Sequence, residues 1–363
     1  MRISVIRPSE LGTADISAWR GMQRSSSHLD NPFLSPDFTI AMGEVRPEAR
    51  VAVISESDGP VGFFPFELHG GGVSAALGGW VSLSQGVVHR PGAEFDSDAL
   101  LRACGLSVWE FGCLVDHQPW FRPFETLRQE AVVLDFADGY HAFLDELRER
   151  SPKFLKSTLY KERKLSRDVG EVTSEFAVDD PESFRLLRRW KSAQYQRMGR
   201  ADRFGKAWVV ELVERLHAAD TDDFAGPLSM LYADGRPVAG HFGLRTGTTM
   251  IGWFPAYDPE YARYSPGLIQ HLRMVEAAAK LGITSLDLGI SNGSEYKDAL
   301  CSRTVPVTEG IVRRRSVGAA AHWLRTEPVR RVRRFILDSP VLYGAADRAM
   351  KRYGRLRTGR RSR

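Results

Sequence analysis

The order of the expected strands and helices most restricts the fold, because the same order occurs twice along the chain. The first copy is a strand at 3–6, helices at 15–23 and 36–42, and strands at 50–55 and 60–68. The second copy is a strand near 171–176, helices at 181–198 and 207–218, and strands at 226–232 and 237–244. The two copies share this order without close sequence identity. We therefore expect two similar folds of mixed α/β type in tandem.

Further elements complete each copy and set the expected domain boundaries. The first copy continues with a helix near 97–104 and strands at 107–111 and 131–134. The second continues with a strand at 249–257, a helix at 265–281 and a strand at 285–288. A connecting helix at 140–150 and a basic segment at 153–167, expected to be a solvated helix face, lie between them. The expected units are residues 1–139, residues 140–312 and a basic tail at 313–363.

Length and composition suit a globular protein with two cores. Of the 363 residues, 43% are hydrophobic, which is enough for two domains of about 150 residues each. No run approaches the ~20 apolar residues that cross a bilayer, and the first residues lack the apolar region of a secretory signal. We therefore expect a cytoplasmic protein. Three scattered cysteines, Cys104, Cys113 and Cys301, predict neither a disulfide framework nor a zinc site, so no metal is expected.

Positive charge is concentrated at the C-terminal end. From residue 311 onward lie 16 of the 50 Lys and Arg residues but three of the 45 acids, so this part carries +13 and residues 1–310 carry −8. Its basic residues include those of 329–337 and then Arg348, Lys351, Arg352, Arg355 and Arg357. A basic, partly amphipathic end can bind anionic lipid headgroups, which would place the protein at the inner face of a membrane. A solvated end is the alternative, and we expect it for residues 358–363.

The stretch around Ser265 predicts an anion site at the start of a helix. Ser265 is expected to cap the helix and Pro266 to be its first residue, where a missing N–H has no cost. Gly267 would let a ligand approach the first turn closely. Free N–H groups and the helix dipole attract anions at such a position, and the pyrophosphate of coenzyme A is one natural occupant. A Ser-Pro pair with a purely structural role is the alternative.

Three motifs in the second half together resemble the GNAT-like bacterial acetyltransferases of the CelD/BcsL type, which are described as involved in cellulose biosynthesis. The motifs are Ala256-Tyr257-Asp258-Pro259-Glu260, then Ser265-Pro266-Gly267, then Leu286-Asp287-Leu288-Gly289 followed by Glu295-Tyr296-Lys297. The resemblance covers roughly residues 140–312 and implies two tandem GNAT-like folds. The pattern also looks like the second domain of Fem-type peptidyltransferases, which carry two GNAT-like folds and use aminoacyl-tRNA. Both families form an amide or ester by acyl transfer.

The resemblance implies an acyltransferase that moves an acyl group from acyl-CoA to an amine or hydroxyl, with acetyl as the first candidate for the acyl group. The acceptor would be a sugar, a polysaccharide precursor or a small metabolite. The acyl-CoA would lie where the strands at 249–257 and 285–288 splay apart. Its phosphates would be bound by Arg263, Ser265, Gly267 and Leu268. The chain departs from the usual GNAT phosphate loop at Pro266 and Ile269. Two alternatives are a Fem-like transferase whose tail holds tRNA phosphates and a non-catalytic accessory protein of glycan biosynthesis.

Three residues are candidate catalytic groups. Tyr296, which the resemblance offers as the acid for the leaving thiolate, has a phenol suited to protonating a developing thiolate. His241 alternates with Phe242 on its strand, and an imidazole can accept a proton near neutral pH. Asp287 lies within an apolar strand and needs a partner or a function; a salt bridge to Lys297 is the first expectation, and a base or a substrate anchor the others. Core packing is the structural alternative for Tyr296 and His241.

Further residues are candidate substrate contacts. Lys191, Gln194 and Tyr195 lie on neighbouring turns of one expected helix and could form a polar wall for the acceptor, or simply solvated helix surface. Trp253 and Tyr257 are expected on one face of their strand, where they could stack on a sugar ring or pack in the core. Lys297 could pair with a phosphate or carboxylate of the substrate.

Overall fold

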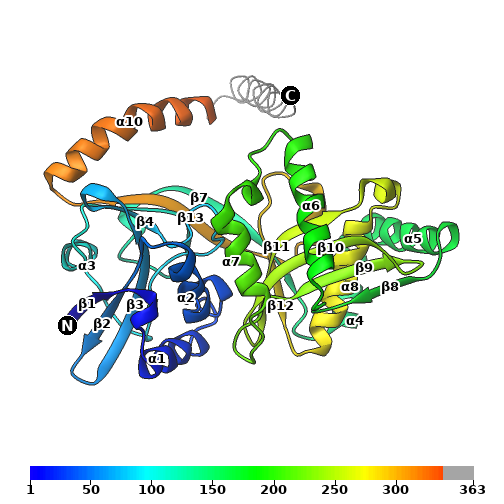
Figure 1. Cartoon of the computed structure of the whole chain (residues 1–363), viewed down its shortest axis with the longest axis horizontal. Helices are drawn as coiled ribbons and strands as arrows, with labels where there is room; N and C mark the ends of the chain where they lie inside the picture. The colour runs from blue at the N-terminus through cyan, green and yellow to red at the C-terminus, as the bar shows by residue number, and fades with distance from the viewer. Residues whose placement is uncertain (338–363) are drawn as a thin grey trace.

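The computed structural model describes residues 1–337, and its described strands form one sheet of 13 strands (Figure 1). The strands of the first half are β1 (Arg2–Ile6), β2 (Ala49–Glu56), β3 (Gly59–Leu68), β4 (Val73–Ala76), β5 (Val88–His89), β6 (Val108–Val115) and β7 (Glu125–Asp135). Those of the second half are β8 (Val172–Glu175), β9 (Leu228–Ala233), β10 (Arg236–Arg245), β11 (Thr249–Tyr257), β12 (Ser285–Ile290) and β13 (Arg303–Arg313). The order across the sheet is β1-β2-β3-β4-β6-β13-β7-β12-β11-β10-β9-β8, with β5 paired to β3.

The two halves of this sheet have the same topology. Counted inward from either edge, three antiparallel pairings are followed by one parallel pairing, β4 with β6 in the first half and β11 with β12 in the second. Each parallel pairing joins only three pairs of residues, at 73–75 with 108–110 and at 249–251 with 285–287. The tandem of two similar mixed α/β folds is therefore confirmed.

The halves exchange one strand each at the centre of the sheet. β7 leaves the first half to lie between β13 and β12, and β13 returns from the second half to lie between β6 and β7. The second of these strands, β13, has no counterpart among the elements expected from the sequence. The expected boundary at 139/140 falls directly after β7, before α4, and stays a prediction because the sheet continues across both halves.

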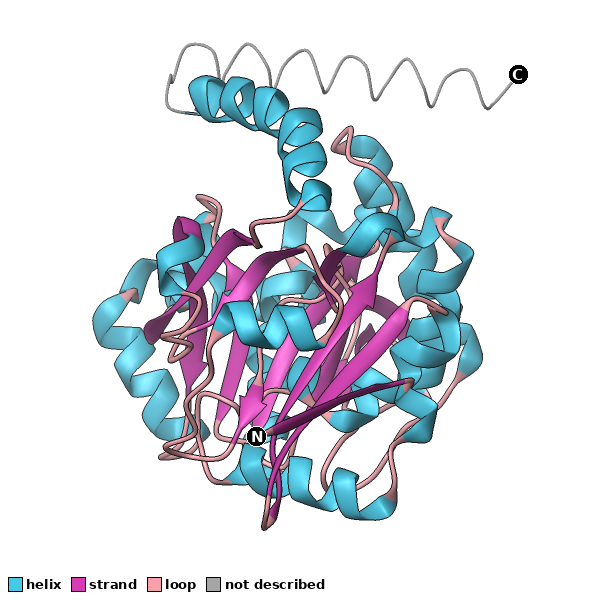
Figure 2. Cartoon of the chain, turned by 90° about the vertical axis from the view of Figure 1, so that its left-hand side faces the viewer, coloured by secondary structure: helices cyan, strands magenta, loops and turns pink. Residues whose placement is uncertain are grey.

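Helices cover both faces of the sheet (Figure 2). They are α1 (Thr13–Arg24), α2 (Pro36–Val45), α3 (Ser97–Ala103), α4 (Tyr140–Arg150), α5 (Pro152–Asp168), α6 (Pro181–Arg197), α7 (Ala207–His217), α8 (Pro266–Lys280), α9 (Glu295–Leu300) and α10 (Val317–Leu337). Cap residues define where several helices begin. The Ser35 hydroxyl accepts a hydrogen bond from the Phe38 N–H at the start of α2, and the Asp180 carboxylate accepts hydrogen bonds from two N–H groups at the start of α6. The basic segment at 153–167 is α5, and four of its six cations are exposed.

Side-chain alternation along β10 separates two cores in the second half. Phe242 packs with Phe184 and Trp190 in the core beneath α6 and α7. On the opposite face, the residues of α8 and α4 form a second core that includes Leu272, Val275 and Phe143. His241 faces this α8 side, where its ring stacks on His271, so the expected alternation of His241 with Phe242 is confirmed.

A bulge in β11 overturns one expectation from strand periodicity. Phe242 pairs with Phe254 and Gly243 with Gly252, so Trp253 is an extra residue on β11. Trp253 packs in the core beneath α6, whereas Tyr257 packs against Tyr264 and Ile269 on the α8 side. The expectation that Trp253 and Tyr257 share a face is wrong, because one extra residue reverses the side-chain alternation beyond it.

The last described helix, α10, projects from the body of the molecule (Figures 1 and 2). Trp323 and Leu324 are exposed on it. Within residues 1–337, no helix combines the length and the apolar character needed to cross a membrane. Arg348, Lys351, Arg352, Arg355 and Arg357 lie outside the described residues, so contact of the tail with anionic lipid or tRNA stays a prediction.

Candidate functional site

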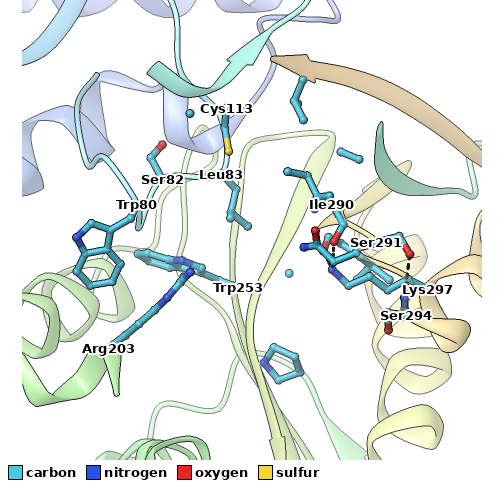
Figure 3. A pocket seen from close by; sticks show the side chains of 18 of the residues that line it. Trp80, Ser82, Leu83, Cys113, Arg203, Trp253, Ile290, Ser291, Ser294 and Lys297 are labelled. Atoms are coloured by element: carbon cyan, nitrogen blue, oxygen red, sulfur yellow. Dashed lines mark hydrogen bonds between the residues drawn. The ribbon is translucent and has the colours of Figure 1, made fainter. Parts of the chain in front are cut away.

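The sheet opens where β11 and β12 diverge. Their parallel pairing ends at Ile251 and Asp287, and β12 then bends at Gly289, which has a φ of 69°. A cavity of about 850 Å³ occupies the opening and is lined by side chains from both faces of the sheet (Figure 3). The expectation that the strands at 249–257 and 285–288 splay apart is confirmed.

The cavity brings together seven residues that the sequence singled out. These are Lys191, Gln194, Tyr195, His241, Trp253, Tyr296 and Lys297. The first three come from α6, whereas His241 and Tyr296 reach the cavity from the α8 side. Residues of the first half complete the lining on the other side, among them Trp80, Ser82 and Cys113 (Figure 3). The cavity therefore lies between the two halves of the chain.

Lys191 is a buried lysine in the cavity wall, with 8% of its surface exposed. Its Nζ donates a hydrogen bond to the backbone oxygen of Pro255 at 2.8 Å and lies 5.3 Å from the centre of the Tyr195 ring. Burial, and next the charges of Arg203, Arg200 and Lys297, lower the pKa of Lys191 from 10.5 to about 7. No carboxylate among the described side chains pairs with it. An amine in this state can both donate and accept a proton near neutral pH.

His241 and His271 form a buried pair of imidazoles at the α8 side of the cavity. Their ring centres are 5.1 Å apart in a stacked arrangement, and 1% and 3% of their surfaces are exposed. No ring nitrogen of either residue has a hydrogen-bond partner among the described residues. Burial, then the nearby positive charge, lowers the pKa of His271 to about 4 and that of His241 well below 6.5. Burial thus lowers the pKa of His241 from that of an exposed imidazole, and its role as a general base stays a prediction.

Gly252 makes room for the His241 ring. A Cβ atom at residue 252 would lie 2.7 Å from both Cε1 and Nε2 of His241 and 3.2 Å from Cδ2 of Leu288. His271, in contrast, was not expected in the site, because it lies in the middle of a helix whose apolar pattern concealed it. The only local signal was a pair of polar residues, Gln270 and His271, on the buried side of α8.

Tyr296 and Lys297 lie in the first turn of α9, which follows β12 after a short turn at 291–294. The Tyr296 ring packs edge-on against His271 with the ring centres 5.5 Å apart, and burial raises the pKa of its phenol. The phenol is therefore protonated at neutral pH. Lys297 Nζ donates to the backbone oxygens of Leu288 and Ile290 at 2.5 and 2.9 Å. These two bonds fix the turn that carries α9 to the cavity.

Asp287 does not form the expected salt bridge with Lys297. Its Oδ1 accepts the backbone N–H of Gly289 at 2.6 Å, and no described cation pairs with it within 4 Å. The cause is the bend at Gly289, which supplies a backbone donor next to the carboxylate, while Lys297 bonds to carbonyl oxygens. Burial raises the pKa of Asp287 to about 6. Asp287 does not line the cavity, so its catalytic role stays a prediction.

The residues predicted to bind the carrier's phosphates lie together at the start of α8, outside the cavity lining. The helix begins at Pro266 as expected, but Ser265 has left-handed geometry (φ 51°) and its hydroxyl caps no N–H. That hydroxyl accepts a hydrogen bond from Lys161 Nζ of α5 at 2.8 Å. The Arg263 guanidinium lies over the Tyr264 ring, Leu268 is half-buried, and a Cβ at Gly267 would lie 3.6 Å from Tyr257. Tyr257 thus contacts α8 instead of the cavity.

Comparison with known proteins agrees with this architecture. Residues 152–298 match the model of the acetyltransferase (GNAT) domain. FemX has a similar structure, with 10% identity, a TM-score of 0.60 and coverage of 86% of this chain and 96% of FemX. A conserved protein of unknown function from Bacteroides thetaiotaomicron is 12% identical with a TM-score of 0.54, and the match covers 86% of this chain and 100% of that protein. The C-terminal domain of a protein described as a putative lysylphosphatidylglycerol synthetase from Agrobacterium fabrum is 13% identical with a TM-score of 0.52. The match covers 85% of this chain and 96% of that domain.

These likenesses establish the class of fold. The chain has a GNAT-like fold with a mixed sheet, and its second half carries the part that matches the acetyltransferase domain model. No curated protein sequence matches the chain. Membership of the CelD/BcsL type and a role in cellulose biosynthesis stay predictions.

Proposed function

We propose that the cavity catalyses transfer of an acyl group from acyl-CoA to an amine or hydroxyl, with acetyl as the first candidate for the acyl group. The acceptor would be a sugar, a polysaccharide precursor or a small metabolite. The observation that carries this proposal is the opening between β11 and β12, lined from both faces by side chains that carry ionisable groups. A carrier entering from the α8 side would place its thioester in the opening. The acceptor would approach from the α6 side, along Lys191, Gln194 and Tyr195.

The acceptor attacks the thioester carbonyl carbon, a new C–N or C–O bond forms, and the C–S bond breaks. The Lys191 amine, whose pKa burial lowers to about 7, takes in its neutral form the proton that the acceptor loses. His241 and His271 stay neutral and offer ring nitrogens to the acceptor or to water. The Tyr296 phenol protonates the departing thiolate. Lys191 thus replaces His241 as the proposed base, and Asp287 supports the turn that carries Tyr296.

Binding of acetyl-CoA tests the donor. We expect saturable binding in calorimetry, and we expect Lys161→Ala to weaken it about tenfold, because a charged hydrogen bond to a phosphate is lost where Lys161 contacts Ser265 at the start of α8. Lys153→Ala, at the exposed far end of α5, is the matched control and should leave the affinity unchanged. Absence of binding would exclude acyl-CoA as the donor, and equal affinity of the two variants would place the phosphates elsewhere.

An aminoacyl-tRNA donor is the second candidate, favoured by the basic face of α5. Lys153, Lys156, Arg163 and Arg167 are exposed on this helix, which packs against α8 and the turn before it. A long nucleic acid could follow this face to the cavity, and its affinity would fall steeply with salt. Lys153→Ala then separates the two donors, since it should weaken tRNA binding while leaving acetyl-CoA binding intact. If neither acetyl-CoA nor tRNA binds, the result would favour a non-catalytic accessory protein.

Replacing Tyr296 with phenylalanine should lower kcat about tenfold, below the effect typical of a general acid because a thiolate is a good leaving group. The variant keeps the ring that packs on His271, so the thermal midpoint should stay close to that of the unchanged protein. Steady-state kinetics with a thioester donor measure the effect. An unchanged kcat would show that the thiolate leaves without a proton from Tyr296.

A further inference from the structure

The first half of the chain has a strand separation equivalent to the one at the cavity, and another segment of the chain pairs with β6 there. β4 and β6 separate after three residue pairs, as β11 and β12 do. Gln85 then enters the gap: its N–H donates to Cys113 O at 2.8 Å and its carbonyl accepts from Val115 N at 2.9 Å. Its side-chain Oε1 accepts the N–H groups of Gly112 and Cys113. Gln85 therefore takes a place beside β6, in parallel register with Leu114, where β4 has separated from it.

The segment that contains Gln85 also forms a wall of the second half's cavity. The lining includes Gly79, Trp80, Ser82, Leu83 and Gln85. Trp253 ties the two parts together, because its indole N–H donates to Val81 O at 3.1 Å across the junction. Residues 78–85, called the acceptor wall below, thus line the same cavity as Lys191 of α6, but from the other half of the chain. Figure 3 shows Trp80, Ser82 and Leu83 of this segment.

The acceptor wall is held firmly at its turn. Gly78 and Gly79 have φ values of 78° and 46°, and a Cβ at Gly78 would lie 3.0 Å from Ser82. The Gly78 N–H donates to the buried Glu67 carboxylate, and Gln85 Nε2 donates to Gly79 O at 2.8 Å. Loop bonds on both sides of Trp80 therefore fix its backbone before any ligand arrives.

Trp80 stands at the mouth of the cavity with 51% of its surface exposed. The Trp208 ring meets it edge-on with ring centres 5.8 Å apart, and the Arg203 guanidinium lies over one face of the indole, 5.4 Å from the ring centre, which leaves the other face for a ligand. Arg203 and Arg200 both line the cavity, and neither pairs with a carboxylate among the described side chains. An exposed indole on a rigid turn, next to unpaired N–H donors, offers an apolar face and polar contacts together.

We propose that the acceptor wall binds a sugar acceptor, with the pyranose ring stacked on Trp80 and its hydroxyls bonded to Arg203. A pyranose has one face of C–H groups and an equatorial rim of hydroxyls, which matches the indole face and the guanidinium donors. A preformed turn lowers the entropy lost on binding. This inference rests on the proposed transfer reaction and names the class of its acceptor. The first half then contributes to acceptor recognition.

Saturation-transfer NMR with the whole chain tests the inference without any acyl donor. The probe is glucosamine, and ethanolamine serves as the matched amino alcohol without a ring. We expect saturation of the C–H protons on one glucosamine face and none for ethanolamine. Trp80→Ala should weaken glucosamine binding about fivefold, the size of a lost aromatic contact, and Trp80→Phe should restore most of it. Tyr160→Ala removes an equally exposed aromatic residue, on α5, and should change nothing.

Several outcomes would overturn the sugar assignment. These are equal glucosamine signals in the Trp80→Ala and unchanged proteins, no signal from glucosamine, or equal signals from glucosamine and ethanolamine. A signal from uridine in place of glucosamine would assign the wall to nucleosides and overturn the proposal too. Circular dichroism of Trp80→Ala and Trp80→Phe shows whether a loss reflects unfolding. Because donor binding is measured separately, loss of sugar binding with intact acetyl-CoA binding would leave the proposed reaction standing, and the reverse result would leave the acceptor wall standing.

Discussion

Replacing Lys191 with methionine should make the protein more stable and almost inactive. Turnover should fall about a thousandfold, the effect of losing a general base. Methionine has similar length and suits a buried position, so the packing of α6 on β11 should survive. The expected combination of higher stability and lost activity distinguishes a functional lysine from a structural one.

The stability gain follows from the pKa of Lys191. The folded protein holds this pKa at about 7, against 10.5 for an exposed lysine. Between these two values the unfolded chain binds a proton that the folded chain lacks, so stability falls as the pH decreases from 10.5 to 7 and is level below 7. Methionine has no ionisable group, so it removes this loss of stability at low pH. The gain should be on the order of 3 kcal/mol below pH 7, after loss of the hydrogen bond to Pro255, and should vanish toward pH 10.5.

Thermal unfolding at several pH values and turnover of the same preparations measure both effects. Arg197→Met is the control, since Arg197 is an exposed cation near the end of the same helix, and its loss should change neither quantity much. In the unchanged protein, turnover should rise as the pH increases through about 7, because only the neutral amine accepts a proton. A Lys191→Met protein that melts earlier yet keeps its turnover would show that Lys191 only holds Pro255 in place.

Local patterns predicted those parts of the fold that depend on local forces. The start of α8 at Pro266 and the opposite faces of His241 and Phe242 follow from the restricted φ of proline and from strand alternation. The bulge at Trp253 has no comparable signal, because the residue becomes extra only when β10 pairs beside it. That one residue moved Tyr257 from the cavity to the α8 side.

Non-local contacts account for the other differences. β13 contains Pro306 and several charged residues, so its sequence alternates weakly, and its place between β6 and β7 depends on a strand exchanged between the halves. The low pKa of Lys191 depends on burial and on Arg200 and Arg203, which follow α6 in a separate loop. Gln85 has no visible role until the first half's gap is compared with the cavity. Sequence analysis could therefore locate seven of the residues that line the cavity, but not their protonation states or the acceptor wall.

The second large effect is expected at Gly252, where alanine should lower turnover about a hundredfold, as a displacement of about 1 Å at a reacting centre does. The added methyl would overlap the His241 ring, which cannot turn away because it lies stacked on His271. Either His241 is pushed against His271 or β11 moves from Leu288. Overpacking of this kind should also cost about 1–3 kcal/mol of unfolding free energy.

A double variant locates the clash. If the methyl group acts through His241, Gly252→Ala should destabilise the His241→Ala protein much less than the unchanged protein, since the smaller side chain vacates the space that the methyl group needs. Gly21→Ala is the control for the glycine change itself, because no atom lies within 4 Å of a Cβ at this position in α1, and helix propensity should make it slightly stabilising. Thermal and denaturant unfolding of the four proteins give the coupling energy. Equal destabilisation by Gly252→Ala in both backgrounds would place the clash at Leu288 instead, and unchanged turnover in the single variant would remove the opening between β11 and β12 from the proposed site.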